Sequence, residues 1–200
     1  APRNGRPYTG SFGNFKNQVV RLKAEGFYLT VFSLSIFLES FINLKDKKMP
    51  EIVATPRALL ALVERLIREP LLAVDLEADS MHHYQEKVCL IQISTPVESV
   101  LIDPLALPDL SPLAPVLADP AIRKIFHGAD YDIRSLHRDF GIEVHNLFDT
   151  MIACQFLGEK EVGLAAVLLK RFGAELDKRY QKADWSKRPL SSDMIEYAVR

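Results

Sequence analysis

The stretch "LLAVDLEAD", residues 71–79, sets two acids among apolar residues. Side chains of an extended chain alternate between two faces, so Asp75 and Glu77 share one face while Val74 and Leu76 share the other. Two like charges beside a buried strand repel each other unless a cation compensates them, and carboxylate-rich sites favour Mg²⁺ or Mn²⁺. The stretch therefore predicts a core strand that carries half of a metal site, with plain solvated or capping acids as the alternative.

Two further strands are expected soon after the first, which we place at Leu71–Leu76. "VCLIQIS" predicts a strand at Val88–Ser94 and "SVLI" one at Ser99–Ile102, with short polar separations that favour an antiparallel meander. The stretch before them, "TPRALLALVERLIRE", predicts an amphipathic helix with Thr55 as N-cap and a proline in its first turn.

Beyond the meander the chain alternates between strand and helix. Strands are predicted at "RKIFHG" and "VHNLFD" and helices at "ADYDIRSLHRDFG", "TMIACQFLG" and "GLAAVLLKRFG", each closed by glycine, after the proline-punctuated helical turns of "PDLSPLAPVLADP". A last helix begins at Ser191 or Ser192 and is expected to run to the end of the chain. The fold class is therefore α/β: a mixed sheet, with a three-strand antiparallel meander plus parallel strands, flanked by helices. This architecture resembles the ribonuclease H-like fold.

Residues 1–48 differ in composition from the rest of the chain. They carry eight Lys and Arg against three Asp and Glu, whereas residues 49–200 carry 17 against 23. The apolar run at residues 27–38 is shorter than the roughly 20 residues of a membrane helix, and no clear cleavage site marks a signal peptide. Translated upstream sequence that is not native, a disordered extension and an anchor for a membrane or partner stay open. We expect one folded domain at residues 49–200, beginning at Met49.

Cysteine use and charge point to an intracellular chain with a local ligand site. Cys89 and Cys154 lie far apart in apolar runs, which is typical of buried reduced thiols and makes a cytoplasmic location the default. The acidic main region argues against broad adhesion to nucleic acid, so a nucleic-acid partner would need a local site or bound cations. A membrane partner is not expected.

Two more segments offer chemistry, each with a plain structural alternative. In "HGADYDIRSL", Asp130 and Asp132 fall at a helix start, where acids also serve as caps and favour the helix dipole. In "SSDMIEYAV", Tyr197 falls on a helix, where taken alone it would be an ordinary core or surface tyrosine.

In their order along the chain, these segments resemble the RNase D group of the DEDD 3′–5′ exonuclease superfamily, in its tyrosine-containing branch. "VDLEAD" resembles the first exonuclease motif, "FHGADYDIRSL" the second and "YAVR" the opening of the third; "FDTMIACQFLG", "GLAAVLLKRFG" and "QKADWSKRPLS" are also similar to that group. A lone D-x-E is weak evidence, but the ordered set is specific. The resemblance covers Met49 to Arg200.

The resemblance implies roles for individual residues. Asp75, Glu77 and Asp132 would be catalytic metal ligands, with Asp132 preferred to Asp130 because the ligand of the family directly precedes an apolar residue. Tyr197 would orient or help deprotonate the attacking water. The fourth carboxylate of the family falls on the residue after Arg200, which the sequence does not contain, so we expect weakened metal binding and little activity in a chain that ends there.

The implied activity is metal-dependent 3′–5′ exonuclease cleavage that uses two divalent ions, Mg²⁺ or Mn²⁺, and releases nucleoside 5′-monophosphates. RNA 3′ ends are favoured over DNA, with processing of tRNA or other structured RNA as the implied task. A Werner-type DNA exonuclease and a catalytically impaired nucleic-acid-binding module are the alternatives. No obligate protein partner is evident, and the oligomeric state is open.

Contacts to the substrate are expected from three further residues. His127 is either a structural histidine at a strand end or a contact to the substrate backbone, and Lys182 and Arg188 belong to a local basic cluster that could meet phosphates. The remaining polar candidates are interpreted as structural or left out of the metal site: Gln92 and Trp185 as structural, His82 and His83 as loop residues outside the metal site.

Overall fold

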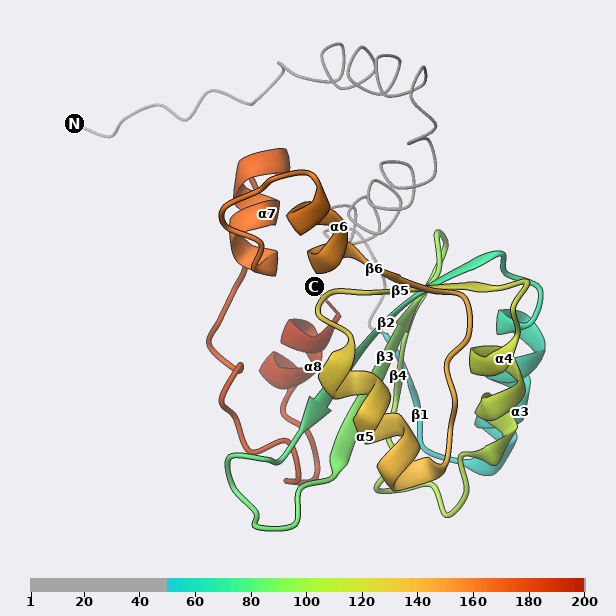
Figure 1. The fold of residues 1–200 in the computed structure, drawn as a ribbon. Coiled ribbons are helices and arrows are strands. Elements are labelled where there is room, and N and C mark those ends of the chain that lie inside the picture. The colour runs from blue at the N-terminus through green and yellow to red at the C-terminus, as the bar shows by residue number, and fades with distance from the viewer. Residues whose placement is uncertain (1–49, 200) are drawn as a thin grey trace. The chain divides into compact units, whose positions relative to one another are not determined.

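The computed structural model describes residues 50–199, so the predictions for residues 1–48 lie outside the described residues. These residues form one six-stranded sheet with the order β1-β4-β3-β2-β5-β6 (Figure 1). Its strands are β1 (Glu51–Val53), β2 (Leu71–Ala78), β3 (Val88–Ser94), β4 (Ser99–Ile102), β5 (Arg123–Phe126) and β6 (Leu147–Asp149).

The sheet is mixed, as the sequence predicted. β2, β3 and β4 form the antiparallel meander, while β5 and β6 extend the sheet beside β2 in parallel. β1, which was not predicted, adds a parallel edge strand next to β4. Its three residues are too few to show the alternating pattern of apolar and polar residues that predicts a strand.

Two strand boundaries differ from the prediction for physical reasons. β2 continues past Leu76 to Ala78, because Glu77 still pairs with Leu90 before the register shifts at a bulge. β6 begins only at Leu147, since Asn146 adopts a positive φ of 52° that an extended strand does not accept.

The helices follow the capping signals of the sequence. They are α3 (Pro56–Leu66), the short 3₁₀ helix η2 (Ser111–Leu113), α4 (Ala114–Ala118), α5 (Asp130–Phe140), α6 (Thr150–Phe156), α7 (Leu164–Phe172) and α8 (Ser192–Ala198). Thr55 caps α3 and Ser191 caps α8 by accepting backbone N–H bonds. Gly141 and Gly173 take the left-handed conformation after α5 and α7, as a glycine stop requires. α8 ends at Ala198, earlier than the predicted run to the end of the chain.

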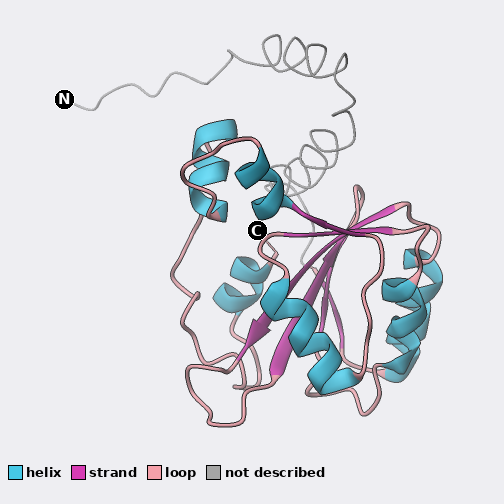
Figure 2. Ribbon diagram, in the orientation of Figure 1, coloured by secondary structure: helices cyan, strands magenta, loops and turns pink. Residues whose placement is uncertain are grey.

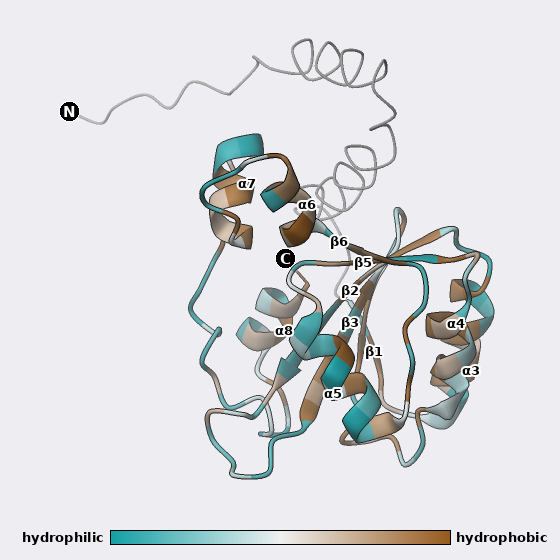
Figure 3. Ribbon diagram, in the orientation of Figure 1, coloured by the Kyte–Doolittle hydropathy of each residue, from teal (hydrophilic) through white to brown (hydrophobic). Residues whose placement is uncertain are grey.

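The main hydrophobic core lies on the face of the sheet covered by α3, α4 and α5. Val74 and Leu76 point into it from β2, as their alternation predicted. Figure 2 shows α3 and α4 beside each other on one side of the strands. Figure 3 shows that the strands are largely hydrophobic, while the helices carry both hydrophobic and hydrophilic residues.

A smaller core covers the opposite face, where Asp75 and Glu77 point. It consists of Leu90, Leu101 and Cys89 from the sheet together with Trp185 and Ala198 from the C-terminal part of the chain. α8 lies on this side of the sheet, across from α3 and α4 (Figure 1). In the described part of the chain, no helix is both long and apolar enough to cross a bilayer.

Candidate active site

The two acids of β2 occupy the sheet face that α8 only partly covers. Asp75 pairs in register with Gln92 of β3, and Glu77 pairs with Leu90. The Asp75 side chain is exposed to solvent, whereas Glu77 is half-buried. The Gln92 amide donates a hydrogen bond of 3.5 Å to Glu77 Oε1. Gln92 thus holds one of the acids, a role that its place on a core strand could not reveal.

The geometry separates the two acids at the start of α5. Asp130 points outward, where its carboxylate forms an exposed ion pair with Arg134 one helical turn later. Asp132 is only 9% exposed and faces the sheet. Of the two acids, Asp132 is therefore the one whose charge acts on the acids of β2.

The pKa values of all three carboxylates are raised, and the charge of Asp75 contributes to the shifts of the other two. Burial raises the pKa of Asp75 to about 6, although the residue as a whole keeps exposed surface. Burial and the charge of Asp75 raise the pKa of Glu77 to about 8, with a smaller contribution from Asp132. Burial, Asp75 and Asp149 raise the pKa of Asp132 to about 8. Such a cluster of mutually repelling acids is stabilised by a positive charge placed among them.

Tyr197 of α8 completes the arrangement. Its ring packs against Trp185 at 5.9 Å and against Tyr180 at 5.7 Å between centroids. Burial, followed by the charges of Glu77 and Asp75, raises the pKa of its hydroxyl to about 12. Trp185 is 1% exposed and anchors this ring, so the structural interpretation of Trp185 agrees with its place in the smaller core. The structure therefore brings together all four residues that the resemblance marked as catalytic.

Asp149 positions α5 and was not predicted. It caps α6, and its oxygens also accept hydrogen bonds of 3.0 and 2.8 Å from the backbone N–H groups of Gly128 and Ala129, just before α5. Gly128 has a φ of 80°, and a Cβ there would lie 3.3 Å from Met151 Cε. An aspartate before a threonine in "FDT" signals an N-cap, but its second set of bonds depends on a loop far away in the sequence.

The predicted substrate residues divide into three cases. His127 is largely fixed within the fold, since its Nδ1 lies 2.9 Å from Thr150 Oγ1, and that hydroxyl donates to the Phe126 carbonyl. The Lys182 side chain is exposed and available to a ligand. The third case, Arg188, needs a correction.

Arg188 is not available for phosphate binding. A guanidinium has five N–H donors, and all five are used here. Three of them go to the backbone carbonyls of Cys89, Trp185 and Lys187, and Nε and Nη2 bind the Asp103 carboxylate at 2.7 Å each. Arg188 therefore joins the C-terminal segment to β3 and to the end of β4. The basic residues in the sequence did not show that Arg188 pairs with a buried acid from a distant part of the chain.

The donor set fits a hard divalent cation held in an open site. Among residues 50–199, no group of three or more His, Cys, Asp or Glu side chains is placed to hold a metal ion by itself. Mg²⁺ characteristically binds through one or two carboxylates, several waters and a substrate phosphate. The carboxylates of Asp75, Glu77 and Asp132 would therefore hold such an ion only together with waters and a substrate phosphate.

A family described as 3′–5′ exonuclease matches residues 50–200. The exosome complex component 10 homolog of Caenorhabditis elegans is 43% identical over 159 residues, which are 79% of this chain and 18% of that protein. This chain spans less than a fifth of the length of several such curated relatives.

Two solved structures share the fold. The catalytic core of RRP6 from Trypanosoma brucei is 41% identical with a TM-score of 0.72, covering 76% of this chain and 43% of that one. RNase D of Escherichia coli, named as an exoribonuclease involved in structured RNA processing, is 34% identical with a TM-score of 0.71 and covers 75% of this chain and 40% of that one.

Proposed function

This chain belongs to the 3′–5′ exonuclease family, with RNase D-like members of the DEDD superfamily among its relatives, and on that premise we propose that it removes nucleotides from RNA 3′ ends in a metal-dependent reaction. The observation that carries the proposal is the convergence of Asp75, Glu77 and Asp132 beside Tyr197. The acids come from two separate elements, β2 and α5, and the charge of Asp75 raises the pKa of both Glu77 and Asp132, which requires proximity.

The residues have distinct tasks in the proposed reaction. Asp75, Glu77 and Asp132 would hold the divalent ions, which supply activation of a water and stabilisation of the leaving 3′ oxygen when bound. Gln92 fixes the Glu77 carboxylate, and Asp149 fixes the start of the helix that carries Asp132.

Tyr197 orients the attacking water in this account. With a pKa of about 12, its hydroxyl keeps the proton at neutral pH. It can therefore donate one hydrogen bond and accept another, but it is a poor base under those conditions. Of the two roles that the resemblance implied, orientation is the one we propose.

RNA is the proposed substrate because the RNase D relative is named for structured RNA processing. A two-ion mechanism, release of nucleoside 5′-monophosphates and trimming of tRNA remain parts of the proposal. The C. elegans relative bears the name of an exosome component, which weakens the expectation of a chain that acts without a protein partner. A cytoplasmic location likewise remains a proposal.

The test is a cleavage assay with matched oligonucleotides. RNA and DNA of one sequence, labelled at the 5′ end, are incubated with the protein and either Mg²⁺ or EDTA. Because little activity is expected without the fourth carboxylate, the proposal predicts a ladder that shortens slowly from the 3′ end. It also predicts nucleoside 5′-monophosphate products and faster loss of RNA than of DNA, all abolished by EDTA. Internal cuts, or cleavage that persists in EDTA, would contradict it.

A further inference from the structure

The loop between β2 and β3, residues 79–87, presents an aromatic ring to solvent directly beyond the acids of β2. We name it the hairpin loop. Tyr84 at its centre is fully exposed, and Met81 is 65% exposed. Its sequence, "DSMHHYQEK", adds two histidines and a terminal lysine.

Hydrogen bonds fix both ends of the hairpin loop. Asp79, which is completely buried, accepts a bond of 2.8 Å from the backbone N–H of Lys87, while its own N–H donates to the Lys87 carbonyl. The next N–H, that of Val88, donates to Asp139 of α5 at 2.8 Å. The exposed ring of Tyr84 is therefore carried by a closed loop and not by a frayed end.

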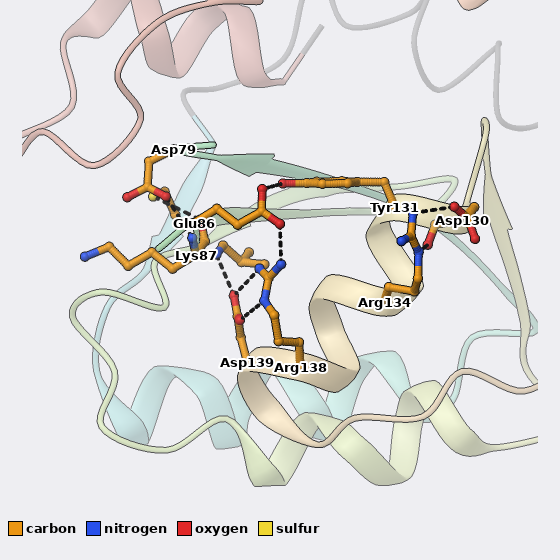
Figure 4. Close-up of polar contacts among 10 residues, drawn as sticks. Asp79, Glu86, Lys87, Asp130, Tyr131, Arg134, Arg138 and Asp139 are labelled. Carbon is orange, nitrogen blue, oxygen red and sulfur yellow. Dashed lines mark hydrogen bonds and ion pairs between the residues drawn. The ribbon is translucent and has the colours of Figure 1, made fainter. Parts of the chain in front are cut away.

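Glu86 ties the hairpin loop to the helix that carries Asp132. The Tyr131 hydroxyl donates to one Glu86 oxygen at 2.9 Å, and Arg138, almost two turns further along α5, binds the other (Figure 4). Arg138 also binds Asp139. The hairpin loop thus lies along the exposed side of α5, and its first contact with that helix, at Tyr131, is one residue from Asp132.

The hairpin loop also contacts the segment that supports Tyr197. His82 Nε2 lies 3.1 Å from the Lys182 carbonyl oxygen, and His83 Nε2 lies 3.1 Å from Ser186 Oγ. Trp185, between those two partners, packs on the Tyr197 ring. The hairpin loop and residues 182–187 therefore form one continuous surface next to the proposed site.

Two exposed lysines give this surface cationic groups. Lys87 and Lys182 are exposed, and Figure 4 shows Lys87 extending away from the polar network beneath it. The nearby acids are engaged: Glu86 with Arg138, and Asp184 with Ser186 and, at 3.7 Å, with Lys187. An exposed aromatic ring beside cations is a combination that binds single-stranded nucleic acid without sequence preference.

We propose that the hairpin loop and residues 182–187 form a second RNA contact, which holds single-stranded nucleotides on the 5′ side of the reacting one. Tyr84 stacks on a base, and Lys87 and Lys182 contact phosphates. This inference rests on the proposed function, because it assumes that the RNA 3′ end lies among the acids. It adds affinity for longer strands and leaves the chemistry to Asp75, Glu77 and Asp132.

RNA length separates this contact from the reacting site. Binding is measured by fluorescence anisotropy with phosphorothioate RNAs of three and twelve nucleotides. Stacking on one ring contributes about 1–3 kcal/mol, so Tyr84→Ala should weaken binding of the twelve-nucleotide RNA by at least about 5-fold and leave the trinucleotide unchanged. Tyr84→Phe should bind as the wild type does. The matched control is Val97→Ala, an exposed apolar residue in the β3–β4 turn.

The lysines have a separate readout. Lys182→Ala should lower the slope of log affinity against log salt by about one for the longer RNA, whereas Arg57→Ala on α3 should not change it. Unchanged affinity of Tyr84→Ala for the twelve-nucleotide RNA would overturn the proposal, and so would an equal loss for both lengths, which would place the effect at the reacting site.

A crosslinking measurement keeps the inference testable if a variant folds poorly. The wild-type protein is irradiated with RNA that carries 4-thiouridine upstream of its 3′ end, and crosslinked peptides are identified by mass spectrometry. Crosslinks within residues 79–87 are expected, and crosslinks confined to other segments would refute the contact. If the hairpin loop bound a protein partner instead of RNA, the crosslinks would be confined to other segments. Failure of the proposed function itself would appear differently, as wild-type protein that binds RNA but does not shorten it.

Discussion

Removing the Asp149 side chain should remove both the cap of α6 and the hydrogen bonds that hold the loop before α5. In the folded chain its carboxylate accepts bonds from Met151 and Ile152 at the start of α6 and from Gly128 and Ala129 before α5. An N-cap contributes about 0.5–2 kcal/mol, and each buried N–H that loses its acceptor costs about 1–3 kcal/mol. Since these terms are not additive, we expect Asp149→Ala to lower the free energy of unfolding by about 2–4 kcal/mol.

The pH dependence of this loss follows from the pKa of Asp149. Burial opposes its ionisation, but the four backbone N–H bonds outweigh burial and lower the pKa from its ordinary value of 3.8. A carboxylate with a lowered folded-state pKa stabilises the protein above its unfolded pKa, and this stabilisation disappears as the pH falls through the folded value. The wild type should therefore lose its advantage over Asp149→Ala in strongly acidic solution.

Urea denaturation of both proteins at neutral and acid pH measures the effect. Asp149→Asn, which keeps one acceptor oxygen but no charge, should fall between them at neutral pH. A loss below about 0.5 kcal/mol in Asp149→Ala would refute the reasoning, because it would show that the four bonds have little net value. A difference from the wild type that does not vary with pH would refute the part assigned to ionisation.

Three further outcomes are expected. Arg188→Ala should reduce the free energy of unfolding by about 3–5 kcal/mol, because it leaves the Asp103 carboxylate without its cation. The folded variant should keep its affinity for RNA. Normal stability with weaker RNA binding would instead favour a phosphate contact by Arg188. Asp132→Asn should reduce cleavage by at least about 100-fold, whereas Asp130→Asn should change stability by no more than about 0.5 kcal/mol and leave cleavage intact; similar losses in both would contradict the assignment. Adding aspartate after Arg200 to the 200-residue chain should increase Mg²⁺-dependent cleavage, with added asparagine as the control, since equal rates for the two would exclude a ligand there.

Much of the fold could be predicted from local signals. The period of two in "LLAVDLEAD" placed Val74 and Leu76 in the core, and the Thr55 and Ser191 caps and the Gly141 stop marked helix ends through bonds within a few residues. Signals of this kind are written in neighbouring residues. β1 escaped because three residues are too short to show a period, and its pairing with β4 is decided in space.

The site was less predictable where partners lie far apart in the sequence. Asp75 and Glu77 reveal themselves by their spacing on one strand. Gln92 and Asp149 do not, since their bonds to Glu77 and to the loop before α5 exist only after folding. Arg188 showed the opposite error, because a basic residue near a site implies a ligand only until its folded partners are known.

Direct measurement of metal binding tests the central claim. Isothermal titration of the wild-type protein with Mn²⁺ should show binding at the site formed by Asp75, Glu77 and Asp132. Asp75→Asn should abolish that binding, and with it the Mg²⁺-dependent shortening of RNA from its 3′ end. The free energy of unfolding of this variant should be unchanged or slightly higher, because a repelling charge is removed. If Asp75→Asn binds Mn²⁺ and shortens RNA as the wild type does, the three carboxylates are not the metal site.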